Sequence, residues 1–273
     1  MKKVVDGLVL REYPCGDNDR LITVLTAKEG KLQMTVKGVS SSRNYSSSLA
    51  RLFNYSNFEY YERYGRRFVS GGSVNDSFSP IQRDVEGYAL AAYIVQIAAE
   101  ITGEGVEAEE ILRMTLNTLY LIAQKKKPLP HIKAVYELFA AKAAGYEPDL
   151  WRCGRCHTEG EGTLWLDVMN GCLQCDRCLR LQGRGQPLPE LDAYSARNIL
   201  IPLDQSALAS MRYVLMATPN RIFSFSLTEG ESLKCFCRAT ETYLLNHLER
   251  GFDSLEFYHA VMSVAEKKED KTE

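Results

Sequence analysis

The first third of the chain carries short runs in which polar and apolar residues alternate or β-branched residues gather. Residues 31–37 (KLQMTVK) alternate at every position, which is typical of a strand with one buried face. The runs that predict strands are 8–10, 21–26, 31–37, 58–61 and 68–70, and a serine-rich, partly helical link is expected over 40–52. Five strands in so short a segment predict a small β-barrel, with half of a sandwich as the alternative.

From residue 79 onwards the spacing of apolar residues becomes helical. Ser79-Pro80-Ile81-Gln82 predicts a helix start, with a serine cap, a proline in the first helical position and a capping-box glutamine. Further helices are predicted over 107–124 and 132–144, and the helical pattern resumes over 192–262 after a cysteine-rich insert. The expected fold class is α+β and multidomain, with a barrel over 1–78, an α-helical domain over 79–150 and 180–265, the insert over 151–179 and a disordered tail over 266–273.

The composition and the start of the sequence indicate where in the cell the protein is expected to be. The chain has 273 residues and a net charge of -2, and no apolar run approaches the roughly 18 residues that a membrane-spanning helix needs. Its start lacks the long apolar stretch of a secretory signal, so the expected location is the cytoplasm. Because that compartment is reducing, the eight cysteines are not expected to form a disulfide framework, and those that cluster are expected to bind metal or carry redox chemistry.

The clearest chemical motif is a set of C-x-x-C pairs. Cys153-Gly154-Arg155-Cys156 is one pair, and Cys172, Cys175 and Cys178 form two overlapping ones. Two C-x-x-C turns supply the four thiolates of a closed tetrahedral zinc site, and the spacing expected between the turns fits either second pair. The hairpin signal Asn170-Gly171 favours the later pair. The expected ligands of one structural Zn²⁺ are therefore Cys153, Cys156, Cys175 and Cys178.

Two other interpretations of these cysteines are weaker. The stretch 151–156 (WRCGRC) faintly resembles the redox motif of thioredoxins, but that chemistry needs a βαβ setting and no second pair. A catalytic zinc would keep an open position and use His or Glu, and of the four histidines only His157 is near in sequence. Phosphate-loop, dinucleotide-binding, zinc-deaminase and nucleophile-elbow motifs are all absent from the sequence, so no enzyme is expected.

Basic residues gather in the later strands of the predicted barrel. Residues 1–78 hold 12 Lys and Arg against 8 Asp and Glu, and residues 31–67 hold 7 against 2. The aromatic residues interleaved with them are Tyr45, Phe53, Tyr55, Tyr60 and Tyr61. Small barrels bind single strands with cations along the backbone and aromatic faces under the bases. The candidate DNA-binding residues are Lys37, Arg43, Arg51, Arg63, Arg66 and Arg67, with a merely solvated face as the alternative.

Several short stretches are informative through their order and spacing. They are 17–21 (DNDRL), 36–38 (VKG), 49–53 (LARLF), the cysteine insert and 250–257 (RGFDSLEF). Together they resemble RecO, a bacterial family of recombination mediators and DNA-repair proteins. Members of that family usually carry a second glycine before the second cysteine pair, where this chain has Cys172. In that alignment Cys172 is a spare thiol and Cys175 and Cys178 are the ligands.

The resemblance implies an N-terminal OB-fold followed by an α-helical domain that contains a zinc-binding module. It implies a non-enzymatic mediator of DNA repair and homologous recombination that binds single- and double-stranded DNA and anneals complementary strands. It also implies help in loading RecA on DNA coated by single-strand-binding protein. The partners would be RecR, the C-terminal tail of single-strand-binding protein and, indirectly, the RecA filament, in the cytoplasm at the nucleoid.

Two other classes of function stay open. In the first, the barrel and a zinc ribbon form an interaction module that binds RNA or protein, and a strand-annealing assay separates it from a mediator. In the second, the cysteines form a dithiol oxidoreductase, which metal analysis and an insulin-reduction assay test.

Overall fold

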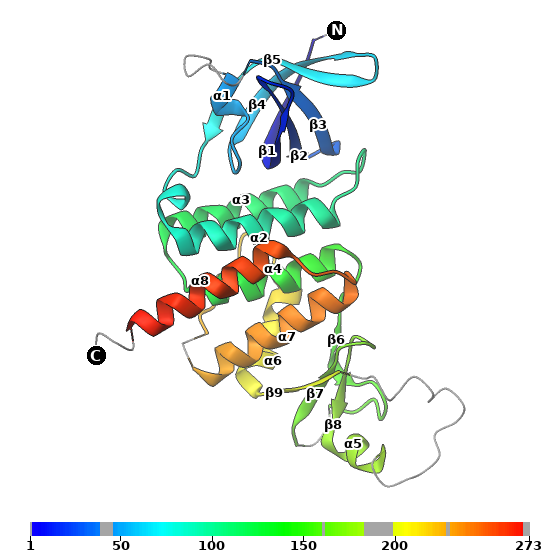
Figure 1. Ribbon diagram of the computed structural model, residues 1–273. Coiled ribbons are helices and arrows are strands. Elements are labelled where there is room, and N and C mark those ends of the chain that lie inside the picture. The colour runs from blue at the N-terminus through cyan, green and yellow to red at the C-terminus, as the bar shows by residue number, and fades with distance from the viewer. Residues whose placement is uncertain (1, 39–45, 160–161, 183–198, 228–229, 270–273) are drawn as a thin grey trace. The chain divides into compact units, whose positions relative to one another are not determined.

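The computed structural model describes residues 2–38, 46–159, 162–182, 199–227 and 230–269 (Figure 1). The chain divides into two compact units. The barrel unit comprises Met1–Leu129 and Phe252–Glu273, and the cysteine unit comprises Pro130–Gly251. Helices of the predicted α-helical domain belong to both units. The domain boundaries drawn from the sequence stay a prediction.

The barrel unit begins with five strands that close on themselves (Figure 1). They are β1 (Lys2–Cys15), β2 (Asp19–Thr26), β3 (Gly30–Val36), β4 (Tyr55–Arg63) and β5 (Arg66–Asp76), in the order β1-β2-β3-β5-β4. β1 also pairs with β4, and the parallel pairing of β3 with β5 completes the closure. The predicted barrel is confirmed, and its closure excludes the half-sandwich.

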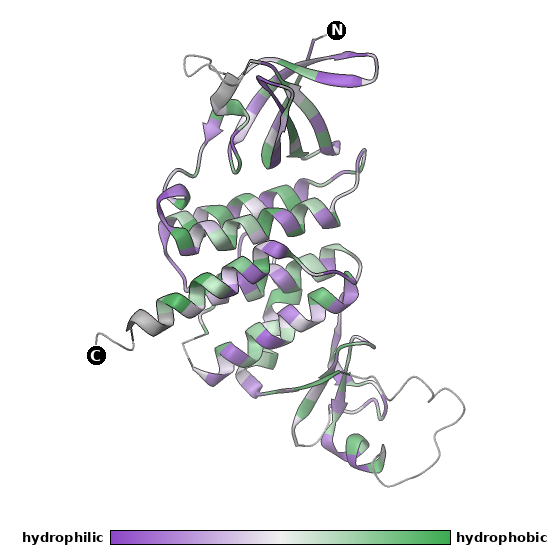
Figure 2. Cartoon of the chain, in the orientation of Figure 1, coloured by the Kyte–Doolittle hydropathy of each residue, from purple (hydrophilic) through white to green (hydrophobic). Residues whose placement is uncertain are grey.

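The barrel core follows from the alternation in the sequence. On β3 the side chains of Leu32, Met34 and Val36 are buried, while those between them are partly or fully exposed. Figure 2 shows the same exchange of hydrophobic and hydrophilic residues along the barrel strands. The short helix α1 (Ser46–Leu49) lies in the predicted serine-rich link, and its buried Leu49 joins the core. Burial of these apolar side chains is the main source of the barrel's stability.

A turn of the barrel contacts a loop between two helices of the same unit. These helices are α2 (Val85–Ile101) and α3 (Glu109–Gln124), and the turn joins β2 to β3. Lys31 N donates to Gly103 O over 3.0 Å, and Gly105 N donates to Glu29 O over 2.9 Å. Gly30 adopts a φ of +61°, and a Cβ there would lie 2.2 Å from Gly103 O. The close approach of the two backbones therefore requires glycine.

The predicted helix start at Ser79-Pro80-Ile81-Gln82 is wrong. The chain forms a 3₁₀ turn, η1 (Ile81–Arg83), and α2 begins at Val85. Asp84 is extended between them, at φ -127° and ψ 112°, and neither helix has a side-chain hydrogen bond at its N-cap. The buried side chain of Ile81 holds the turn as a separate element, which a local capping signal does not reveal.

The last helix returns to the barrel unit. α8 (Asp253–Glu269) lies against α2, where the rings of Tyr93 and Phe252 meet edge to face at 5.6 Å and Ser254 Oγ donates to Gln96 Oε1. α8 extends through Glu269, so residues 266–269 of the predicted disordered tail are helical. Residues 270–273 lie outside the described residues.

Three helices form much of the cysteine unit: α4 (Leu129–Ala143), α6 (Gln205–Met216) and α7 (Glu231–His247). Every residue of α4 from His131 to Ala141 is buried. Among the described residues of the whole chain, no helix is long and apolar enough to cross a membrane.

A small sheet carries the cysteines. It consists of β6 (Asp149–Cys153), β7 (Leu164–Asp167), β8 (Cys172–Cys175) and β9 (Leu200–Leu203), in the order β6-β8-β7-β9. β9 corrects the prediction of a continuous helical pattern over 192–262, because residues 200–203 pair with β7. Residues 183–198 lie outside the described residues. The apolar run of β9 is short, and its pairing with β7 decides its conformation.

Candidate metal centre and nucleic-acid interface

Two turns bring the four cysteines together. The first follows β6 and holds Cys153 and Cys156, and the second holds Cys175 at the end of β8 and Cys178 in the first turn of α5 (Asp176–Gln182). β6 and β8 pair in parallel, which places their C-terminal ends side by side. Gly154 N donates to Leu173 O over 2.8 Å and fixes the first turn against β8.

The four sulfur atoms have the spacing of a metal site. All of them lie within 4.8 Å of one another, and Cys156 Sγ lies 3.8 Å from Cys175 Sγ. A tetrahedral ion bound at about 2.3 Å from each sulfur would have sulfur–sulfur edges of about 3.8 Å. Cys153, Cys175 and Cys178 are buried and Cys156 is partly buried, so the group is a closed site that could hold a metal ion.

Hydrogen bonds lower the pKa of two of the thiols, Cys156 and Cys153. The Thr158 hydroxyl lies 3.1 Å from Cys156 Sγ, and its hydrogen bond, together with one from the Thr158 backbone, lowers the pKa of Cys156 to about 6. Burial raises the pKa of Cys153, but backbone N–H groups, including that of Cys175, outweigh burial and lower it overall. Burial and the neighbouring sulfur atoms raise the pKa of Cys178 to about 12. A bound cation would favour all four thiolates.

Cys172 stays outside this group. Its sulfur is directed toward Gly154, where it lies 2.8 Å from the position of an added Cβ. Burial, reinforced by the charge of Asp167, raises the pKa of Cys172 to about 11. His157, the other ligand considered from the sequence, is exposed and is not part of the group found among the described residues. The structure thus brings the later pair, Cys175 and Cys178, close to Cys153 and Cys156.

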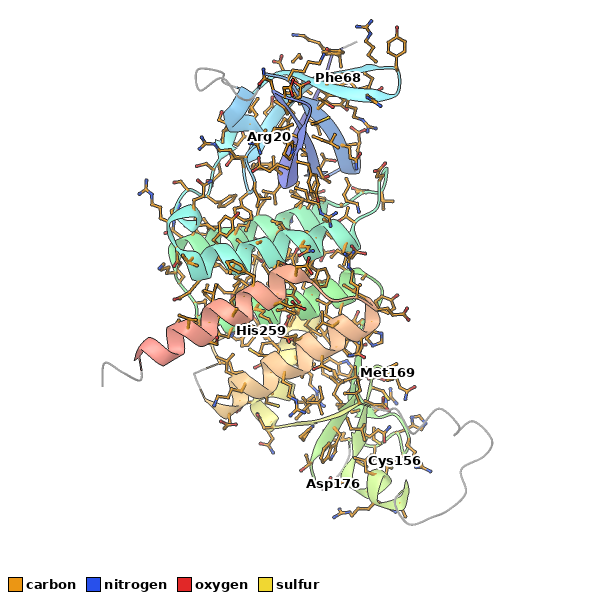
Figure 3. All side chains as sticks on the ribbon, viewed as in Figure 1. Arg20, Phe68, Cys156, Met169, Asp176 and His259 are labelled. Atoms are coloured by element: carbon orange, nitrogen blue, oxygen red, sulfur yellow. The ribbon has the colours of Figure 1, made fainter. Side chains whose placement is uncertain are left out.

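Polar contacts around the sheet hold the two turns. Asp167 Oδ2 accepts hydrogen bonds from Asn170 over 2.8 Å and from Gln174 over 2.6 Å, which closes the β7–β8 hairpin. Trp165 Nε1 donates to Asp176 Oδ1 over 2.9 Å at the start of α5. Figure 3 shows Cys156 and Asp176 in this part of the cysteine unit. The predicted turn at Asn170-Gly171 is present, with Gly171 at a φ of +61°.

Some of the predicted DNA-binding residues share one face of the β4–β5 hairpin. Tyr61 pairs with Phe68 and Arg63 pairs with Arg66, so these four side chains point to the same side. The rings of Tyr61 and Phe68 stack at 5.6 Å, and Lys37 Nζ lies 5.0 Å from the centre of the Phe68 ring. Figure 3 marks Phe68 on the barrel. We call these five residues the hairpin face; Lys37, Arg63 and Arg66 are its exposed cations.

Two of the other predicted cations, Arg51 and Arg67, lie outside the hairpin face. Arg67 belongs to the opposite side of the hairpin, where its Nε lies 3.4 Å from Glu62 Oε1. Arg51 lines a cavity of about 360 Å³ with Val74, near the end of β5 that is remote from Arg66. Arg43 lies outside the described residues. The structure therefore brings together three of the six predicted cations.

The aromatic residues also divide. Phe53 and Tyr60 are buried in the barrel unit, Tyr55 is half-buried, and Tyr45 lies outside the described residues. Sequence reasoning missed two aromatic residues of the hairpin, Phe68 and the exposed Tyr64. The sequence feature that could have identified these two residues is the two-residue turn Tyr64-Gly65, because this turn sets the register that pairs Phe68 with Tyr61.

The fold and the cysteine group define an OB-like barrel protein with helical additions and a potential metal-binding module. The family model described as Recombination protein O N terminal matches residues 1–78, and the model described as Recombination protein O C terminal matches residues 82–256. The chain belongs to this family, RecO, which confirms the resemblance seen in the sequence. The family supports a role in DNA repair and recombination.

Relatives named DNA repair protein RecO align over most of the chain. One from Acetivibrio thermocellus is 23% identical over 251 residues, which cover 92% of this chain and 94% of the relative. One from Symbiobacterium thermophilum is 25% identical over 264 residues, covering 95% and 97%. One from Anaeromyxobacter dehalogenans strain 2CP-C is 29% identical over 216 residues, covering 78% and 83%.

Proposed function

We propose that this protein mediates DNA repair and homologous recombination by binding single- and double-stranded DNA, annealing complementary strands and assisting the loading of RecA. The observation that carries the proposal is the hairpin face, where exposed cations lie beside stacked aromatic rings. Cations suit the phosphates of a strand and aromatic faces suit its bases. The protein works by holding and handing over strands, without a catalytic step.

Phosphate binding is assigned first to Lys37, Arg63 and Arg66, which are exposed. Arg43, Arg51 and Arg67 are proposed as further contacts outside that face. Contacts to phosphate carry no sequence information, so binding should be indifferent to sequence. Contacts of this kind release counterions, so affinity should fall steeply as salt rises.

One structural Zn²⁺ is proposed for the four-cysteine group. Four thiolates at tetrahedral spacing suit zinc, and a site with all four positions filled by protein has no place for a reacting water. Zinc held by Cys153, Cys156, Cys175 and Cys178 would fasten the turn after β6 to β8 and α5. Its contribution is to the folding of the cysteine unit, and DNA binding does not depend on any chemistry at the ion.

The proposed partners are those of a recombination mediator. They are RecR, the C-terminal tail of single-strand-binding protein and, indirectly, the RecA filament. The support for them is membership of the RecO family. The location proposed for this role is the cytoplasm, at the nucleoid.

Salt-dependent binding tests the DNA interface. Fluorescence anisotropy with a labelled single-stranded oligonucleotide, measured over a range of salt, gives the slope of log affinity against log salt. Arg63→Ala with Arg66→Ala should weaken binding and reduce the steepness of that slope by about 1.4, since each phosphate contact to a single strand contributes about 0.7.

The matched control removes the same charge from exposed arginines on helices of the barrel unit. Arg83→Ala with Arg113→Ala should leave the slope near that of the wild type, because η1 and α3 are not part of the hairpin face. Equal slopes for the wild type and the hairpin variant would refute the assignment of the hairpin face to DNA.

A further inference from the structure

The tip of the β4–β5 hairpin is built from an unusual pair of residues. Arg63 pairs with Arg66, so Tyr64 and Gly65 alone form the turn, and both have positive φ, +51° and +71°. A turn of this type favours asparagine followed by glycine, because an L-residue with a side chain is strained at positive φ. Tyr64 occupies the strained position, and the residue is 89% exposed. The tyrosine therefore adds nothing to the core that would offset the strain.

The flanking arginines are also unfavourable for the isolated hairpin. Like charges that face each other across two strands repel, and Arg63 and Arg66 are directly opposite. Arg63 Cζ lies 5.1 Å from the centre of the Tyr64 ring, so one guanidinium is already held beside the aromatic face. An anionic, aromatic ligand would relieve the repulsion and use the exposed ring. Strain of this kind, gathered at an exposed point, is characteristic of binding sites.

The tip continues into the hairpin face. Arg63 and Arg66 lie next to Tyr64 in space. The stacked rings of Tyr61 and Phe68 come next, and Lys37 lies beside Phe68. Cations and aromatic rings thus follow one another along one side of the hairpin as far as the end of β3, which pairs with β5. A ligand with repeated phosphates and repeated planar rings matches this order better than a folded protein surface does.

We propose that Tyr64 stacks on a nucleobase of single-stranded DNA while Arg63 and Arg66 contact the adjoining phosphates. This inference rests on the proposed function and assigns to it a specific base-binding residue. Single strands are the expected ligand because their bases are free to stack on a protein ring, whereas the bases of a duplex are already stacked on one another.

A base analogue reports the contact directly. The probe is a single-stranded oligonucleotide with 2-aminopurine at successive positions, added to the full-length protein, because stacking on an aromatic ring changes the fluorescence of this base. Tyr64→Ala should remove the change and weaken binding by about 10-fold, whereas Tyr64→Phe should retain both, since stacking needs the ring and not the hydroxyl. Tyr120→Ala is the matched control, because Tyr120 is an exposed tyrosine on α3 whose ring centre also lies 5.1 Å from a cationic group, Lys126 Nζ.

Tyr64→Asn separates binding from folding. Asparagine tolerates positive φ, so this variant should unfold at a higher temperature than the wild type and yet bind the oligonucleotide about 10-fold more weakly. Unchanged affinity and fluorescence in Tyr64→Asn and Tyr64→Ala, with salt-dependent binding intact, would overturn the stacking assignment and leave the proposed function standing. A wild-type protein that binds no single-stranded DNA would overturn both.

Discussion

Cys172 and Cys175 are the first and last residues of β8, and only the second has its sulfur in the four-cysteine group. Cys175→Ala removes a metal ligand from a closed site, so the purified protein should lose nearly all its zinc and the cysteine unit should unfold at a lower temperature. Cys172→Ala should keep about one zinc per chain. Elemental analysis of both variants gives the answer.

The opposite pattern would show that the ion uses the earlier of the two overlapping pairs. Absence of zinc from freshly prepared wild-type protein would refute the proposed zinc site and favour the alternative in which the cysteines carry out redox chemistry. An insulin-reduction assay would then test that activity.

Helices α4 and α7 of the cysteine unit are joined by buried charge. Lys133 Nζ lies 2.8 Å from Glu137 Oε1 and 2.6 Å from Glu241 Oε2, and Thr240 Oγ1 donates to Glu137 Oε2 over 2.9 Å. Burial opposes the charge on Lys133, but the two carboxylates outweigh burial and raise its pKa, so the lysine stays protonated. The pair on α4 is almost completely shielded from water, at 3% and 0% side-chain exposure.

Loss of one partner from this network should be costly. Lys133→Met leaves the Glu137 carboxylate buried without its cation, and should destabilise the protein by about 3–5 kcal/mol in urea unfolding. Lys234→Met, which breaks an exposed pair with Glu231 on α7, should cost about 0.5 kcal/mol or less. Similar losses in the two variants would show that the buried network contributes no more than a surface pair.

Several elements were predictable from local patterns in the sequence. β3 alternates because one side faces the barrel core, and α3 and α4 begin and end within a few residues of the expected positions. β9 and η1 were not predictable, because pairing with β7 and the burial of Ile81 decide them, and neither contact is local in sequence. Period and propensity describe a segment, whereas strand pairing depends on what lies beside it.

The candidate sites were likewise predictable in part from the sequence, and the rest of each site depends on strand pairing. Two C-x-x-C turns predicted the four-cysteine group almost completely, because close spacing leaves few geometries, and only the position of Cys172 outside the group needed the pairing of β6 with β8. The proposed DNA interface was less predictable. Basic composition identified the barrel, but the register of one hairpin separated Arg66 from Arg67 and added Phe68 and Tyr64.

In the molecule as a whole, DNA binding is proposed for one compact unit and metal binding for the other. The barrel unit presents the hairpin face, and the cysteine unit contains the four-cysteine group. DNA binding is therefore expected to follow the charge of the hairpin, and zinc content to follow the cysteines. The mediator role requires more than binding, because strands covered by another protein must also be brought together.

The annealing of coated strands tests that role most directly. Complementary oligonucleotides are coated with single-strand-binding protein and mixed, and duplex formation is followed by fluorescence energy transfer with and without the protein. The account predicts that the wild type and Arg83→Ala with Arg113→Ala accelerate annealing, and that Arg63→Ala with Arg66→Ala loses most of the acceleration. Duplex formation at the same rate with and without the wild-type protein would contradict the account and favour a module that binds RNA or protein.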